Sequence, residues 1–417
     1  MLKFYNTLSR KKEVFLPRSI SKRLLRGRPW EINWYQLRES EILGLKGNLL
    51  RELVNLGVKK AGSLNRLSKS IGMSNGQLWF DLNKPPKLVS VRKLKRLALF
   101  IGIKYDYFNN KISEIRKGKV ASIKNPKFPF NLATKEGAAI LGNIVSDGCI
   151  YIDKKARNVM RTKYAAGTKE ELEKFIDNIN KIFGKVYFQK EEMRNSVYLK
   201  IGSSIIAEGL CKVGAPIGNK AKIDPEIPWL IKKSPEELKK AYLRAIFDDE
   251  GCIAGKELNF YINCSKKKRY DLYITFSRSI HINKYLNETQ KRLLKKIEPY
   301  MKERQFPTGH KIKSIEIRKA IKILKTAKEN IHSIKNFLLE IQPKLLRNEA
   351  ELLTSLGIQN RIRNSRLDLT GNGTYSVVSE LRIQRRKNVL NFYRKINFGL
   401  SNKKERLKTL LLDKKWI

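Results

Sequence analysis

Two short segments of the chain end in a carboxylate followed by glycine, and these acids are the residues most able to do chemistry. Residues 139–148 read AILGNIVSDG, and residues 242–251 read YLRAIFDDEG. Each segment is a largely apolar stretch with helical spacing, and each is followed by Cys-Ile. Because glycine commonly ends a helix, Asp147 and Glu250 are expected at the C-terminal ends of two equivalent helices.

Small residues predict that these two helices pack closely. Ala138 and Gly142 share one face of the first helix, and Ala241 and Ala245 have the same i,i+4 spacing in the second. Helices that meet at such faces approach to the usual ~8–10 Å or less, and their C-termini converge. The two acids would then repel each other, and a divalent cation would relieve that repulsion. The alternative is that each acid is a solvated helix-end residue, which two equivalent copies disfavour.

The two segments resemble the LAGLIDADG motif, and the chain resembles a single-chain, two-repeat LAGLIDADG homing endonuclease of archaeal type. The second copy is preceded by Ile-Pro-Trp at 227–229 and Ser-Pro-Glu-Glu at 234–237, as is usual in such proteins. The first copy departs from the consensus at Asn143 and Val145 but keeps the acid and the glycine. The resemblance covers residues 134–417. It implies an α+β fold in which two pseudo-symmetric αββαββα repeats form an antiparallel β saddle over DNA.

A second internal match supports the duplication. Residues 212–220 (KVGAPIGNK) resemble residues 395–403 (KINFGLSNK) without gaps. These segments lie further apart than the two acids do, so the second repeat must be longer. We therefore expect repeat 1 at 134–233 and repeat 2 at 234–417, with a helical insertion around 281–345. That insertion is either a solvated decoration or an added DNA-contacting element.

The charge of the chain indicates a polyanionic partner. Lys and Arg number 88 against 39 Asp and Glu, which gives a formal net charge of +49. This excess does not distinguish DNA from RNA. The four cysteines have no CxxC spacing, which argues against zinc, and three scattered histidines are too few for a metal triad. No apolar run reaches the ~18 residues that a membrane span needs.

The N-terminal part predicts a separate DNA-binding unit. Residues 1–36 are expected to form a basic, DNA-facing arm; a transit peptide is the alternative. Residues 37–115 are expected to form a small all-α domain that resembles the helix-turn-helix of the lambda-repressor-like family, with a structural bundle as the alternative. Its recognition helix would place Asn75, Gln77 and Trp79 at or near the groove. The basic, proline-containing residues 116–133 are expected to be a linker.

Apolar and polar residues alternate at 196–201, 272–276 and 381–384, which predicts strands with one buried face. Such strands form an antiparallel sheet that is covered on one side and open on the other. In so basic a chain the open face is expected to read DNA. The candidate groove-contacting residues on it are Tyr198, Lys200, Tyr273, Arg382 and Gln384.

The resemblance implies metal-assisted hydrolysis of one phosphodiester on each strand of a long, asymmetric duplex target. Asp147 and Glu250 would hold Mg²⁺ or Mn²⁺. Lys220 and Lys403, which match in the Asn-Lys segments, are candidates for stabilising the transition state or orienting water.

The alternatives are an intron RNA maturase and a DNA-binding regulator that does not cut. Retention of both acids favours the nuclease. We expect a monomer in the cytoplasm, associated with the nucleoid, unless the N-terminal arm directs it to an organelle.

Overall fold

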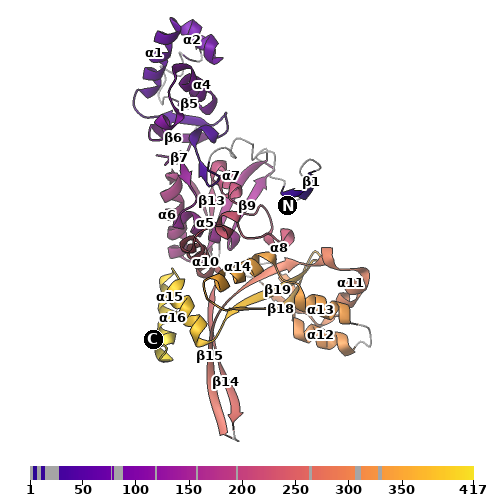
Figure 1. Ribbon diagram of the computed structural model, residues 1–417. Helices are drawn as coiled ribbons and strands as arrows, with labels where there is room; N and C mark the ends of the chain where they lie inside the picture. Colours follow the sequence, from indigo (N-terminus) through magenta and orange to yellow (C-terminus); the bar gives the residue numbers. More distant parts are fainter. Residues whose placement is uncertain are drawn as a thin grey trace.

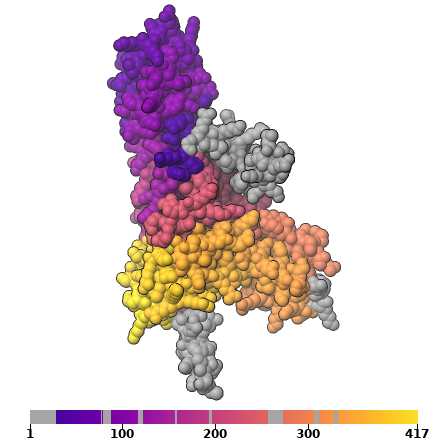
Figure 2. Space-filling model, viewed as in Figure 1, coloured from indigo at the N-terminus to yellow at the C-terminus, as the bar shows by residue number. Residues whose placement is uncertain are grey.

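The computed structural model in Figure 1 is an α+β protein built from antiparallel sheets and the helices that cover them. It describes residues 3–6, 11–14, 28–76, 78, 88–117, 120–155, 158–193, 196–262, 265–305, 311–326 and 331–417. An N-terminal unit lies at one end of the molecule and the second repeat at the other (Figures 1 and 2). No helix in the described part of the chain combines the length and apolar character needed to cross a bilayer.

Two helices form the junction between the repeats: α5 (Lys135–Val145) and α10 (Glu236–Glu250). Thr134 caps the N-terminus of α5, because its hydroxyl accepts the backbone N–H of Gly137 at 3.1 Å. The two helices lie against each other along their small-residue faces. A Cβ built on Gly142 would lie 2.8 Å from the Cβ of Ala245 and 2.6 Å from the carbonyl oxygen of Tyr242. Only glycine permits this approach, so the packing depends on that residue.

The sheet of repeat 1 follows α5 directly. It has the order β12-β13-β10-β9, and every pairing is antiparallel. Its strands are β9 (Gly148–Asp153), β10 (Val159–Ala166), β12 (Phe188–Met193) and β13 (Ser196–Ile201). The helices that accompany it are α6 (Lys169–Phe183), α7 (Ser204–Lys212), α8 (Lys220–Ile223) and α9 (Trp229–Lys232).

The sheet of repeat 2 follows α10 and has the order β14-β15-β19-β18-β17-β16, again antiparallel. Its strands are β14 (Cys252–Ile262), β15 (Ser265–His281), β16 (Lys302–Gln305), β17 (Lys311–Glu316), β18 (Arg361–Thr370) and β19 (Tyr375–Ile383). Its helices are α11 (Glu288–Lys295), α12 (Ile317–Thr326), α13 (His332–Glu340), α14 (Lys344–Ser355), α15 (Arg386–Lys395) and α16 (Ser401–Asp413).

The segment expected as a helical insertion is helical only in part. Helices α11, α12 and α13 lie within it, but β16 and β17 also form a hairpin that extends the sheet beyond β18. Strand β17 buries Ser314 and Ile315 against the sheet, which the helical spacing of the neighbouring residues concealed. The insertion packs Ile297, Leu324 and Leu338 into a second hydrophobic cluster, which it shares with residues of the sheet such as Leu367 and Val377. It therefore widens the sheet as well as covering it.

The predicted strand alternation is confirmed in both repeats. Except for Val197, which is partly exposed, the apolar residues of the alternating segments are buried: Leu199, Ile201, Leu272, Ile274, Phe276, Leu381 and Ile383. Their polar neighbours Lys200 and Tyr273 are partly exposed, although Thr275 is buried and donates to the carbonyl oxygen of Leu381 at 2.7 Å. Both sheets thus have an apolar and a more polar face.

The expectation of an all-α N-terminal domain is wrong. Helices α1 (Leu49–Ala61), α2 (Leu64–Ile71) and α4 (Val91–Ile101) are present, but they pack with a five-stranded sheet of order β11-β7-β6-β4-β5. Its strands are β4 (Ile42–Leu45), β5 (Leu88–Ser90), β6 (Ile112–Lys117), β7 (Val120–Lys124) and β11 (Lys185–Val186). The buried side chains of Ile112, Ile115 and Ile123 give these strands an apolar face.

Residues 116–133 are not a linker, because they form β7 and β8 (Phe130–Asn131). Phe128 and Phe130 are buried and stack on each other, so the prolines on either side of Phe128 lie in a packed segment. Strand β8 pairs with β3 (Glu31–Ile32), inside the expected N-terminal arm. The prediction of a basic arm is therefore wrong for residues 28–36. Trp34 is fully buried there, and its indole N–H donates to Tyr105 O at 2.9 Å.

The N-terminal unit is joined to repeat 1 by buried polar contacts. Arg38 forms an ion pair with the buried Glu208 of α7, and Lys212 donates to the carbonyl oxygen of Glu31 at 2.7 Å. Strand β11 comes from repeat 1 but pairs with β7 of the N-terminal sheet. Of the predicted recognition residues, Asn75 is exposed, whereas Gln77 and Trp79 lie outside the described residues.

Candidate carboxylate site at the helix ends

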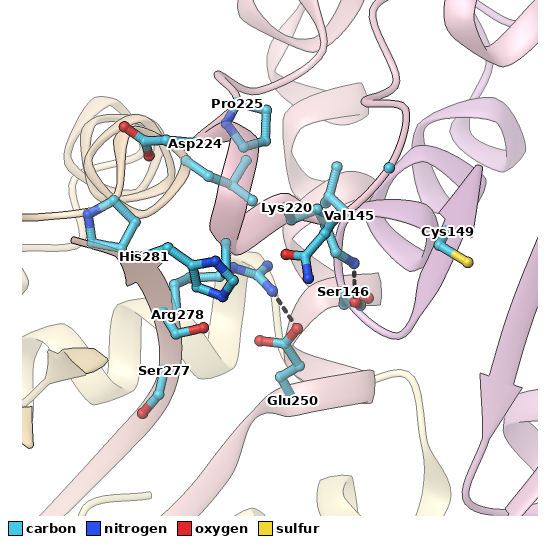
Figure 3. A pocket seen from close by; sticks show the side chains of 16 residues that line it. Val145, Ser146, Cys149, Lys220, Asp224, Pro225, Glu250, Ser277, Arg278 and His281 are labelled. Carbon is cyan, nitrogen blue, oxygen red and sulfur yellow. Dashed lines mark hydrogen bonds and ion pairs between the residues drawn. The ribbon is translucent and has the colours of Figure 1, made fainter. Parts of the chain in front are cut away.

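The C-terminal ends of α5 and α10 lie together at the boundary of the two repeats. Beside them is a recess of about 480 Å³ lined from both repeats, with Ser146, Lys220, Glu250, Arg278 and His281 on its walls (Figure 3). The acid of the second motif therefore faces a cavity, and the acid of the first occupies the adjoining turn.

Asp147 and Glu250 lie close enough for their charges to interact. Asp147 is exposed, but the surrounding protein partly desolvates it and raises its pKa, while Lys220, Arg278 and Lys403 oppose that rise. Burial raises the pKa of Glu250 to about 7, and the charge of Asp147 adds to the shift. The structure thus brings together the two acids that the sequence singled out, in an environment that disfavours two bare negative charges.

Arg278 of β15 holds Glu250 and a second acid at once. Its Nη1 donates to Glu250 Oε1, its Nη2 to Glu349 Oε1 at 2.8 Å, and its Nε to Glu349 Oε2 at 3.3 Å. The side chains of Arg278 and Glu349 are 8% and 0% exposed, and that of Glu250 is 19% exposed. Burial lowers the pKa of Arg278, but the two carboxylates outweigh it and raise that pKa above its ordinary value.

Sequence reasoning missed Arg278 and Glu349, although one signal was available. Glu349 falls on the apolar face of α14, between Leu345 and Leu353, where a charged residue requires a buried partner. Nothing in the sequence identifies Arg278 as that partner, because the contact joins elements far apart in the chain.

Lys220 and Lys403 occupy equivalent places in the two repeats. Lys220 Nζ donates to the carbonyl oxygens of Ile144 (3.2 Å), Ser146 and Gly148 (2.9 Å) at the end of α5. Lys403 Nζ donates to Phe247 O (3.2 Å) and Asp248 O at the end of α10. Burial lowers the pKa of Lys220 to about 8. Both ammonium groups donate to carbonyl oxygens at a helix end, and one of these, Phe247 O, also accepts the backbone N–H of Gly251 at 2.9 Å. The part of these lysines in catalysis stays a prediction.

The acids that precede Glu250 bind within the protein, as expected of structural residues. Asp249 accepts from the Tyr164 hydroxyl at 2.8 Å, from Asn143 Nδ2 at 3.0 Å and from the Ser146 hydroxyl. Asp248 accepts the backbone N–H groups of Gly399 at 2.7 Å and Leu400 at 3.1 Å. Asn143, one of the departures from the motif consensus, is therefore part of a contact between the repeats.

The predicted groove-contacting residues lie on two sheets and form no single cluster. On β13, the ring of Tyr198 carries the ammonium of Lys163 at 3.7 Å, and Lys200 pairs with Glu191. On the second sheet, the guanidinium of Arg382 lies 4.5 Å from the centre of the Tyr273 ring. Gln384 is exposed directly after β19.

A metal ion would find two carboxylates at this site. Among the residues that the structure describes, no group of three or more His, Cys, Asp or Glu side chains is arranged to hold a metal ion. His281 lines the recess, and burial together with Lys222 and Lys284 lowers its pKa, which favours the neutral ring. Magnesium is often held by only one or two carboxylates, with water and phosphate oxygens completing its shell. Asp147 and Glu250 therefore fit such an ion.

Comparison with known proteins finds likeness in structure and not in sequence. No family model and no curated protein matches the sequence. Solved structures of LAGLIDADG homing endonucleases are similar over 64–68% of this chain. I-DmoI in complex with DNA and Mn is 14% identical, with 97% of its chain covered and a TM-score of 0.31. I-LtrWI bound to target DNA is 11% identical, with 92% covered and a TM-score of 0.34. Because these TM-scores are low, the proposals below rest on the residues of this chain.

Replacing Lys220 should test its contact with the helix end. We expect Lys220→Met to destabilise the fold by about 1–3 kcal/mol, because buried carbonyl oxygens lose their donor. Urea unfolding of the full chain measures this, with the exposed neighbour substitution Lys222→Met as the control. Equal unfolding midpoints for the two variants would contradict the role of Lys220 at the helix end.

Proposed function

We propose that the protein is a site-specific DNA endonuclease of the LAGLIDADG type. The observation that carries this proposal is the meeting of Asp147 and Glu250, one from each repeat, at the ends of two closely packed helices. Burial raises the pKa of both carboxylates, and the charge of Asp147 adds to the rise at Glu250, so the pair makes a position that attracts a divalent cation. Their placement at helix C-termini adds to that attraction, because the helix dipole is negative there.

Asp147 and Glu250 would hold Mg²⁺ or Mn²⁺. When bound, such an ion lowers the pKa of water and stabilises the charge that develops on a phosphate under attack. The side chains of this chain supply the rest of the arrangement. Lys220 and Lys403 hold the ends of α5 and α10 through their carbonyl oxygens, so the two acids keep a fixed separation.

Duplex DNA is the substrate that the charge and the repeat arrangement favour. The net charge of +49 suits binding to many phosphates, and one active carboxylate in each repeat suits one cut in each strand. The sheet of repeat 2 has six strands and that of repeat 1 has four, so the two DNA-facing halves are unequal. An asymmetric target recognised by a monomer follows from this inequality.

The N-terminal unit is proposed as a second DNA-binding surface. Helix α2 begins at Ser63, whose hydroxyl accepts Arg66 N at 3.2 Å, and it ends at Gly72 with a φ of 65°. Arg66 and Lys69 on α2 are exposed, and the exposed Asn75 follows them. This arrangement suits a helix-turn-helix that contacts phosphates before its recognition helix.

The central test removes one charge at a time. Asp147→Asn and Glu250→Gln should each abolish double-strand cleavage of a randomised duplex library in Mg²⁺ while leaving duplex affinity unchanged, because each keeps its shape but loses a charge that the cation needs. The exposed substitution Glu405→Gln is the control and should cut as the wild type does.

Three other outcomes of that test would count against the nuclease, and two of them favour a specific alternative. Cleavage by both acid variants at the wild-type rate would contradict the proposal. Tight duplex binding without any cleavage by the wild type would favour a regulator, and a preference for folded intron RNA over every duplex would favour a maturase.

Neutralising α2 tests the N-terminal surface. The double variant Arg66→Gln, Lys69→Gln should weaken binding to all duplexes and reduce the salt slope by about two, since each phosphate contact contributes roughly 0.9 to that slope. The same charge change at Lys404 and Lys408 on α16 is the control. Substitution is preferable to truncation, because β11 completes the N-terminal sheet. Equal slopes for the two double variants would assign α2 a structural role.

A further inference from the structure

We propose that Arg278, anchored by Glu349, is a positioning residue that makes Asp147 and Glu250 unequal in their availability to a divalent cation. In the free protein it holds Glu250, so that a divalent cation binds at Asp147 first. Glu250 becomes available only when Arg278 transfers its Nη1 bond to a DNA phosphate. This inference rests on the proposed endonuclease function.

The hydrogen bonds of Arg278 divide into a fixed pair and a single bond. Glu349 receives two of them, through Nη2 and Nε, and has no exposed surface from which water could replace them. Glu250 receives one bond through Nη1 and keeps contact with solvent. Both Arg278 and Glu250 line the recess, and the bond between them is drawn in Figure 3, so we place the incoming group at the Nη1 end of the guanidinium.

The first repeat has no counterpart of this arginine. In the first sheet Cys149 pairs with Lys163, and at the matching register of the second sheet Cys252 pairs with Thr275. The position that matches Arg278 is therefore Ala166, a buried residue that can form no ion pair. Asp147 accordingly stays exposed, and no ion pair is formed with it among the described residues, although the charges of Lys220, Arg278 and Lys403 oppose the rise in its pKa.

Charge balance explains why DNA is needed to release Glu250. Arg278 supplies one positive charge to the buried Glu349 and the partly buried Glu250, so moving it away from Glu250 leaves that acid without its ion-pair partner, although the charge of Lys220 still acts on it. A phosphate that accepts Nη1, together with a cation on Glu250, restores the balance. Arginine binds phosphate oxygens readily through its fixed fork of donors, which makes a backbone phosphate the fitting acceptor.

Titration of Mn²⁺ into the DNA-free full chain, with the free ion counted by electron paramagnetic resonance, tests the inequality directly. Asp147→Asn should weaken Mn²⁺ binding by tenfold or more, in the range of ~10–100-fold that ligand-shell changes produce, whereas Glu250→Gln should leave it unchanged. Equal weakening by both variants would overturn the inference. Binding that depends on Asp147 alone, in a protein that cuts no duplex, would support the inference and contradict the nuclease.

Strand-resolved cleavage gives a second readout. In Glu349→Gln, Arg278 keeps Glu250 as its one carboxylate partner and holds it more tightly. One strand should therefore be cut about tenfold more slowly, so that nicked duplex accumulates while the rate on the other strand is unchanged. Glu351→Gln, an exposed change on the same helix, is the matched control. A purely structural role for Glu349 would slow both strands together, and that result would overturn the inference.

If Glu349→Gln does not fold, Arg278→Lys decides the matter. Lysine keeps the charge but lacks the fork that bridges two acids, so the DNA-free variant should bind one more Mn²⁺ than the wild type. Wild-type stoichiometry in that variant would overturn the inference.

Discussion

The close approach of α5 and α10 is the constraint on which the rest of the structure depends. Because Gly142 has no Cβ, the backbone of α5 lies directly against Ala245 and the Tyr242 carbonyl of α10, and the two helices end side by side. Gly251 serves the end of α10 itself, because a Cβ there would lie 2.4 Å from the carbonyl oxygen of Phe247 in the last turn of that helix. Each sheet starts directly after its helix, so the position of the acids and the position of the sheets are set together.

Helix ends packed in this way collect uncompensated negative charge, and much of the surrounding structure responds to it. Lys220 and Lys403 cover the terminal carbonyl oxygens, one in each repeat. Asp249 is held by hydroxyl and amide donors of the first repeat, and burial raises its pKa to about 7. Arg278 compensates Glu250. No described residue forms an ion pair with the first acid, Asp147, so the two repeats differ at their chemically equivalent positions.

Local patterns predicted the parts of this arrangement that repeat within the chain. The acid-glycine pairs predicted where the two helices end. The Asn-Lys segments pointed to two lysines that bind the carbonyl oxygen at the same position of each repeat, Ile144 in one and Phe247 in the other. The alternation of apolar and polar residues predicted which faces of the central strands are buried. These features depend on residues close together in sequence, so periodicity and duplication reveal them.

Such local patterns could not predict contacts between segments that lie far apart in the chain. Arg278 and Glu349 meet only through the fold of repeat 2, and β11 joins a sheet whose other strands lie in the N-terminal unit. The short strands β4 to β7 were not predicted, because the helical periodicity of the apolar residues beside them is stronger than the alternation within the strands. Basic residues at 116–133 suggested a linker, although Ile123, Phe128 and Phe130 supply a buried face.

The most direct test of the central claim is anomalous scattering from Mn²⁺ in crystals of the full chain with a cleavable duplex. The account predicts Mn²⁺ on the carboxylates of Asp147 and Glu250, each beside a phosphate of a different strand. A complex in which the duplex lies across both sheets while Mn²⁺ binds at neither acid would contradict it.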